Sequence, residues 1–161
     1  MIARSFRLFF GGLLLICCTS LAGQTIAKSG PTSIHAAVSG KKVDVAIRTA
    51  KIERGSELFP NLETGATSVV VLTDLQIIVN GAKVFVPRSV FADLLDPRTA
   101  SIRADKSDFL LTISGGDASE SYFVSIFFDS AKVKLRRLYS SLIPDVPSQE
   151  TTYRLTVLKD E

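Results

Sequence analysis

The stretch that decides the fold is VVVLTDLQIIVNGAKVFV, residues 69–86. Apolar residues recur at every second position along most of its first half, and this period of two predicts a half-buried β-strand. Asn80-Gly81 follows, the dipeptide favoured in type I′ turns because both central residues adopt a positive φ. A two-residue turn at this point places apolar residues opposite apolar residues on one face. The expected pairs are Val79 with Ala82, Ile77 with Val84, and Leu75 with Val86.

The same period of two recurs on both sides of this hairpin. The exception is Ser89–Leu95, where the apolar residues follow a helical spacing and Pro97 prevents continuation. About seven short strands without a βαβ rhythm are typical of a β-sandwich or a barrel. We therefore predict a mainly β fold, an antiparallel β-sandwich or small barrel with one short helix at Ser89–Leu95. An α+β arrangement is the alternative.

The first 22 residues differ from the rest of the chain. Two arginines precede the uncharged apolar run Leu8–Cys18, and small residues occupy positions −3 and −1 of a cleavage site before Gly23. This order is typical of a secretory signal peptide. The apolar run is too short to cross a bilayer, which takes about 20 residues. We therefore expect residues 1–22 to be a signal peptide and the chain to be exported, to a bacterial periplasm or to the extracellular space.

Leu15-Ile16-Cys17-Cys18 also resembles a bacterial lipobox, in which a cysteine is lipidated. The residue before that cysteine is normally Gly, Ala or Ser, and neither cysteine follows one. Plain secretion is therefore the first interpretation, and a lipid anchor at Cys17 or Cys18 is the alternative. Since both cysteines lie in the signal peptide, the mature chain is expected to fold without disulfides.

Removal of the signal peptide changes the charge. The full chain of 161 residues carries 19 Lys+Arg against 16 Asp+Glu, a net charge of +3. Two of these basic residues and no acidic residue lie in residues 1–22, so the mature chain has a net charge of only +1. We expect residues 23–40, which are small and polar, to be a flexible leader. Residues 41–161 are expected to form a single β-rich domain without a transmembrane span and without a nucleic-acid partner.

The residue types that form most catalytic and metal sites are rare in this chain. His35 is the only histidine and lies in the predicted leader, so we expect no catalytic residue, no metal site and no cofactor. Asp117 and Glu120 form an acidic loop after Gly115-Gly116, and oxygen-only calcium ligation is the less favoured interpretation of it. Asp93 and Asp96 are the other pair of neighbouring acids. Neither pair is specific for glycosidase-type chemistry, which needs two carboxylates on facing elements.

The basic cluster is Lys132, Lys134 and Arg136. In a regular strand these side chains project from one face, where they would contact an acidic partner, an anionic glycan or lipid headgroups. A solvated edge strand whose charges prevent aggregation is the other interpretation. We therefore expect a small, exported, non-enzymatic β-domain that binds a protein or an envelope glycan, as an inhibitor or an immunity protein does. The alternative is a carboxylate-dependent hydrolase that acts on cell-envelope material.

Overall fold

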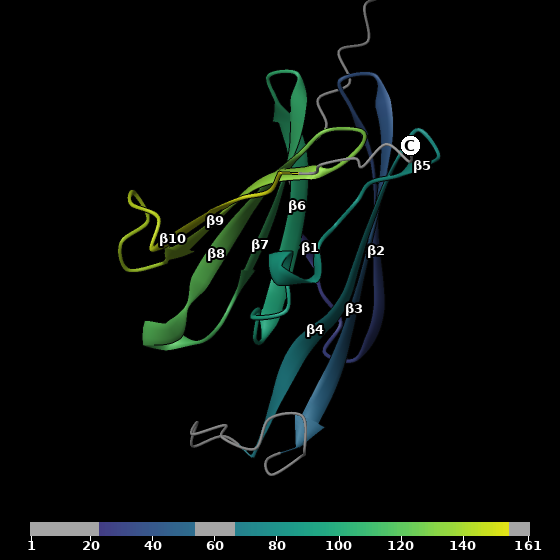
Figure 1. Ribbon diagram of the computed structural model, residues 1–161. Coiled ribbons are helices and arrows are strands. Elements are labelled where there is room, and N and C mark those ends of the chain that lie inside the picture. Colours follow the sequence, from purple (N-terminus) through teal and green to yellow (C-terminus); the bar gives the residue numbers. More distant parts are fainter. Residues whose placement is uncertain (1–22, 54–66, 155–161) are drawn as a thin grey trace, which may run out of the picture.

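The computed structural model describes residues 23–53 and 67–154, which form two antiparallel β-sheets that face each other (Figure 1). Sheet A has the order β1-β6-β7-β8-β9-β10 and sheet B the order β2-β3-β4-β5. The strands of sheet A are β1 (Gln24–Thr25), β6 (Pro97–Asp105), β7 (Asp108–Gly115), β8 (Tyr122–Phe128), β9 (Val133–Ser140) and β10 (Gln149–Thr152). Those of sheet B are β2 (Gly30–Val38), β3 (Lys41–Glu53), β4 (Ser68–Val79) and β5 (Ala82–Lys83). The predicted antiparallel β-sandwich is confirmed.

The core lies between the two sheets, because alternate residues of each strand point inward. Sheet B contributes residues such as Val45 and Ile77, and sheet A contributes residues such as Leu111 and Ile126. Phe109 of β7 stacks on a phenylalanine of β8 with 5.3 Å between the ring centroids. Each such fully buried side chain stabilises the fold by about 1.5–3 kcal/mol, so the alternation seen in the sequence accounts for the two layers.

The hairpin at residues 69–86 forms with its predicted turn but is shorter than expected. Asn80 and Gly81 have φ values of 50° and 84°, and Val79 pairs with Ala82. The Val84 N–H donates to the Ile77 carbonyl at 2.9 Å, which confirms the register up to this point.

The predicted pair of Leu75 with Val86 is wrong, because the return strand leaves sheet B. The Phe85 N–H donates to the Ala131 carbonyl at 2.7 Å, and the Phe85 carbonyl accepts from the Val133 N–H at 3.0 Å. Residues 82–86 therefore cross from β4 in sheet B to the beginning of β9 in sheet A.

The flexible leader predicted for residues 23–40 is wrong for most of its length. Gly30–Val38 forms β2, which pairs with β3 over nine residues, and Gln24–Thr25 forms β1 at the edge of sheet A. Ile34 and Val38 are buried in the core. Thr32 is also buried, and its hydroxyl accepts the Ala27 N–H at 2.9 Å. The inward face of β2 thus combines Ile34 and Val38 with the small or hydroxyl-bearing residues Thr32 and Ala36.

The helix predicted at Ser89–Leu95 is reduced to one turn of 3-10 helix, η1 (Arg88–Val90), and a second 3-10 turn, η2, spans Ala118–Glu120. The apolar residues of the segment predicted to be helical, Val90, Phe91 and Leu94, do enter the core. The backbone then returns to an extended conformation, and Leu95 forms a β-bridge with Val71 of β4. Pairing with the edge of β4 thus replaces the second helical turn.

The predicted signal peptide and both cysteines lie outside the described residues. Within residues 23–53 and 67–154, no helix has the length and apolar character needed to cross a bilayer.

Candidate functional site

The three basic residues predicted to share one face of β9 do not share it. β9 contains a β-bulge opposite β8, where Phe127 pairs with Leu135 and Phe128 pairs with Val133. Lys134 is the extra residue, and a bulge shifts the alternation of all residues that follow it. Val133 and Arg136 therefore both point into the core, each 1% exposed. Lys134 points away from the core, so the predicted common face is wrong.

Lys134 is held by two carboxylates near the surface. Its Nζ lies 2.8 Å from Asp108 Oδ2 and 3.4 Å from Asp129 Oδ2. The hydrogen bond that Lys134 donates to Asp108, reinforced by the negative charges of both acids, raises the pKa of Lys134. This cation is already paired within the chain, which leaves Lys132 as the member of the predicted cluster without a salt bridge among the described residues.

Arg136 is a buried structural anchor. Its Nε donates to the Val90 carbonyl at 3.0 Å, and one terminal nitrogen donates to Gln149 Oε1 at 2.7 Å. The other terminal nitrogen lies 2.8 and 2.7 Å from the two carboxylate oxygens of Asp93. A buried charge is tolerated only when it is paired and hydrogen-bonded in this way. Arg136 thus fastens the segment that follows η1 and the edge strand β10 to β9, and it offers no surface to a partner.

The structure brings both predicted pairs of acids to one cleft of about 350 Å³. Asp117 and Glu120 of the η2 loop line it together with Asp93, Asp96 and Tyr122. The Tyr122 hydroxyl donates to the Leu95 carbonyl at 2.9 Å. Burial, with the negative charges of Asp93 and Asp96, raises the pKa of Tyr122.

Three of these four carboxylates already serve the fold. Asp93 binds Arg136, and Asp96 Oδ1 accepts the Val70 N–H at 2.9 Å. Asp117 accepts the N–H of the first residue of η2 at 2.9 Å and lies 3.2 Å from Arg98. General acid–base catalysis needs a carboxyl group that is free to exchange a proton with the substrate. Asp93, Asp96 and Asp117 therefore hold two loops together at this cleft, and Glu120 is the acid of the cleft whose side chain has no such contact among the described residues.

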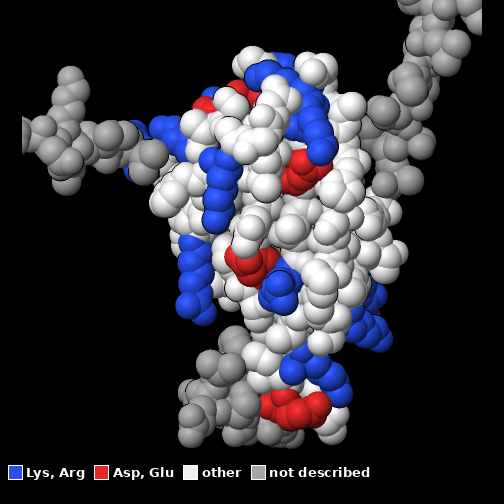
Figure 2. Space-filling view, turned by 90° about the vertical axis from the view of Figure 1, so that its right-hand side faces the viewer, with Lys and Arg blue, Asp and Glu red and all other residues white. Residues whose placement is uncertain are grey.

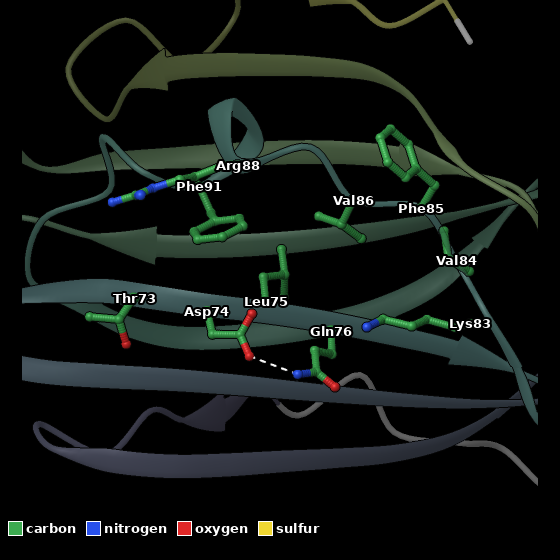
Figure 3. A pocket seen from close by; sticks show the side chains of 10 residues that line it. All are labelled: Thr73, Asp74, Leu75, Gln76, Lys83, Val84, Phe85, Val86, Arg88 and Phe91. Carbon is green, nitrogen blue, oxygen red and sulfur yellow. Dashed lines mark hydrogen bonds between the residues drawn. The ribbon is translucent and has the colours of Figure 1, made fainter. Parts of the chain in front are cut away.

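A lateral groove opens where residues 82–86 leave β4 (Figure 3). Its volume is about 700 Å³. Leu75, Val86 and Phe91 point into the space between the crossing segment and β4. The polar side chains at its border are Asp74, Gln76, Lys83 and Arg88, with Asp74 hydrogen-bonded to Gln76 at 2.8 Å.

The groove coincides with a gap in the pairing of β4. On the outer edge of β4, β5 pairs with residues 78–79, and the segment after η1 bridges residue 71. Residues 73–76 have no paired strand on that edge among the described residues. The groove therefore combines an apolar floor, a positively charged border and an open stretch of sheet edge.

The loop between β9 and β10, residues 141–148, exposes three large apolar side chains. Leu142 is 69% exposed, and Ile143 and Val146 are each 63% exposed. The loop projects from the end of sheet A that lies farthest from sheet B in Figure 1. We call Leu142, Ile143 and Val146 the apolar loop triad. Several large apolar side chains exposed on one loop are a candidate interaction site.

This loop is held in one conformation by its own hydrogen bonds. The Ile143 N–H donates to the Ser140 carbonyl at 3.1 Å, and the Ser148 N–H donates to the Leu138 carbonyl at 2.8 Å. The Ser141 N–H donates to the Ser121 carbonyl at 2.9 Å, which ties the loop to the segment before β8. Pro144 and Pro147 restrict the backbone further. The triad is therefore presented on a preorganised support.

The two prolines are typical of a loop, but the sequence does not predict the exposure of the triad. Apolar residues beside prolines are compatible with burial or exposure, and only the path of the chain beyond the end of sheet A decides between them. On the face shown in Figure 2, where β2 and β3 lie, basic and acidic side chains are interspersed with uncharged atoms. That face therefore offers no dense basic patch to an anionic partner.

No protein-family model, no curated protein and no solved structure matches this chain. The functional argument therefore depends on the geometry of the chain itself.

Proposed function

We propose that this chain is an exported, non-enzymatic β-domain that binds a protein partner through the apolar loop triad. The observation that carries the proposal is the exposure of Leu142, Ile143 and Val146 on one ordered loop. Burial of such side chains in a partner gains about 25 cal/mol per Å² of apolar surface removed from water. Among the described residues, the triad contributes three of the four large apolar side chains that are exposed.

The shape of the loop favours a protein partner. A loop that is fixed before binding loses little conformational entropy when it docks, so more of the contact energy contributes to affinity. Inhibitors of enzymes commonly use such preorganised loops. An inhibitor-like or immunity-like role is therefore the specific form of the proposal. An envelope glycan is less well matched, because the triad offers no polar groups to sugar hydroxyls.

The location is part of the proposal. The basic and apolar composition of residues 1–22 and the small residues before Gly23 support export, to a periplasm or to the extracellular space. The hydrolase alternative is less well supported, because Asp93, Asp96 and Asp117 are engaged by Arg136, by a backbone amide and by Arg98.

Site-specific photo-crosslinking tests the proposal. A benzophenone amino acid replaces Val146 in the triad, and a matched control replaces Ser107, which is exposed in the turn between β6 and β7. Irradiation of cells that express each variant is expected to give a protein adduct at position 146 and none of the same mass at position 107. Identical adduct patterns at the two positions, or no adduct at 146, would contradict the proposal.

A further inference from the structure

The large apolar side chains that are exposed among the described residues lie at only two places. Three form the apolar loop triad, and the fourth is Phe85, which is 53% exposed at the border of the lateral groove. The loop projects from sheet A (Figure 1), and the groove is a recess of about 700 Å³ (Figure 3).

We propose that the apolar loop triad of one copy docks into the lateral groove of a second copy, so that the chain assembles head to tail. This inference rests on the proposed function, because the same loop makes the contact, and it names the partner as a second copy of this chain.

The charges at the two places are complementary. Asp145 lies within the loop, and Lys83 and Arg88 border the groove. None of these three side chains forms a salt bridge with another described residue. The one acid of the groove, Asp74, already accepts a hydrogen bond from Gln76 at 2.8 Å. Docking would therefore bring an unpaired carboxylate to two unpaired cations beside apolar surface.

The apolar floor of the groove suits the triad. Leu75 and Phe91 reach the groove from the core and are almost fully buried, and Val86 lies beside them. Leu142, Ile143 or Val146 would cover the ring of Phe85, which is 53% exposed, together with the small apolar surface that the floor leaves open. Such a contact places apolar residues at the centre and charges at the border, the usual order in protein interfaces.

A chain cannot fill its own groove with its own loop. Phe85 is hydrogen-bonded beside the first residue of β9, whereas the loop follows the last residue of that strand. Eight residues of strand at about 3.3 Å each separate the two places by about 25 Å. The contact must therefore be intermolecular, and because it joins two different surfaces it generates a ring or an open chain of copies.

Two sets of substitutions test the two surfaces of the contact, the apolar loop triad and the lateral groove, one at a time. Leu142→Ser, Ile143→Ser and Val146→Ser together remove the triad, and Lys83→Glu with Arg88→Glu reverses the border of the groove. All five residues are exposed, so both variants are expected to melt like the wild-type chain. A third chain serves as the control. It carries the same charge change away from the groove, with Arg103→Glu in β6 and Lys106→Glu in the turn that follows β6.

Sedimentation velocity of the mature chain over a range of concentrations provides the readout. The wild-type and control chains are expected to associate, with each defective variant at least tenfold weaker. An equimolar mixture of the two defective variants is expected to form a dimer and nothing larger, because one intact loop and one intact groove remain. A wild-type chain that stays monomeric, or a mixture that stays monomeric, overturns the inference.

The outcome also separates this inference from the proposed function. If the wild-type chain is monomeric and position 146 is still crosslinked to a different protein, the self-association is wrong and the binding function stands. If position 146 gives no adduct at all, both are wrong. An adduct of position 146 with this chain itself, lost in the Lys83→Glu, Arg88→Glu variant, supports the inference directly.

Discussion

Arg136 and Leu142 lie close together in the sequence, yet each occupies the environment expected of the other. The arginine is 1% exposed and the leucine is 69% exposed. Hydrogen bonds to Val90, Asp93 and Gln149 compensate the burial of Arg136. No comparable contact within the described residues compensates the exposure of Leu142. A buried charge whose hydrogen bonds all come from the chain itself serves the fold. Large apolar side chains that the chain leaves exposed on one loop instead indicate a partner.

The largest effect is expected at the Arg136–Asp93 pair, and it should be asymmetric. Asp93→Ala leaves a buried guanidinium with an incomplete set of partners, which costs about 3–5 kcal/mol. Arg136→Met leaves Asp93, whose side chain is 51% exposed and regains water, so the expected cost is smaller, about 2 kcal/mol. Urea unfolding of the two variants measures both costs. Equal costs, or a larger cost for Arg136→Met, would contradict this account of the buried charge.

Asp129 provides a smaller effect with a defined pH dependence. Burial acts to raise the pKa of Asp129, but the N–H groups of Ala131 and Lys132, together with Lys134, outweigh it and hold the pKa below 3.8. The charged carboxylate therefore stabilises the fold above its unfolded pKa, and this contribution is lost as the pH falls through the folded pKa. Asp129→Asn is expected to cost about 1 kcal/mol at pH 7.

The difference between Asp129→Asn and the wild-type chain should shrink as the pH falls below about 4, because the unfolded carboxylate takes up a proton first and the folded carboxylate follows at lower pH. Thermal melts at pH 7, 4 and 3 measure it. A constant difference over this range would show that Asp129 acts through its shape and not through its charge.

Lys134 tests whether exposure determines how much an ion pair of β9 contributes to the free energy of unfolding. Its side chain is 40% exposed, so the pair with Asp108 is screened by water. Lys134→Met is expected to cost less than about 1 kcal/mol, well below the cost of Asp93→Ala. Urea midpoints at low and high salt check this, since added salt should narrow the difference in stability between the two chains. A cost as large as that at Arg136 would show that exposure does not distinguish the two pairs.

The apolar loop triad should give the smallest change in stability and the clearest loss of binding. Serine at all three positions is expected to change the free energy of unfolding by less than about 0.5 kcal/mol, because the side chains contact mainly solvent. The same chain should lose the partner recovered by crosslinking at a fourth loop position, Asp145. Substantial destabilisation would mean that the triad packs against the fold and would remove the basis for the binding proposal.

The fold was predictable where local chemistry and periodicity agree. Asn80-Gly81 determines a turn of known geometry, and the alternation before it identifies the buried face. β2 was missed because Thr32 and Ala36 alternate with Ile34 and Val38 on its inward face, and the burial of the small and hydroxyl-bearing pair depends on the neighbouring β3. The short helix was overestimated because the spacing of Val90, Phe91 and Leu94 suits both a helix and a packed turn.

The candidate site was less predictable, because it depends on departures from regular structure. The bulge at Lys134 turns the side chain of Arg136 to the opposite face of β9, and no residue type in β9 predicts a bulge. The groove exists because Phe85 pairs with sheet A and the chain does not continue along β4. The alternation of residues 82–86 does not show which of the two sheets this segment joins. The acidic loops were identified as separate pairs, and only the packing of η2 against the segment after η1 brings them together.

The crossing of residues 82–86 from one sheet to the other affects how the protein unfolds. Lys83 is paired with Ile78 in sheet B, and Phe85 is hydrogen-bonded at the beginning of β9 in sheet A. Neither sheet can therefore separate from the other while this short segment stays bonded at both ends. Unfolding is expected to be a single cooperative transition, in which fluorescence, circular dichroism and hydrogen exchange report the same midpoint for both sheets.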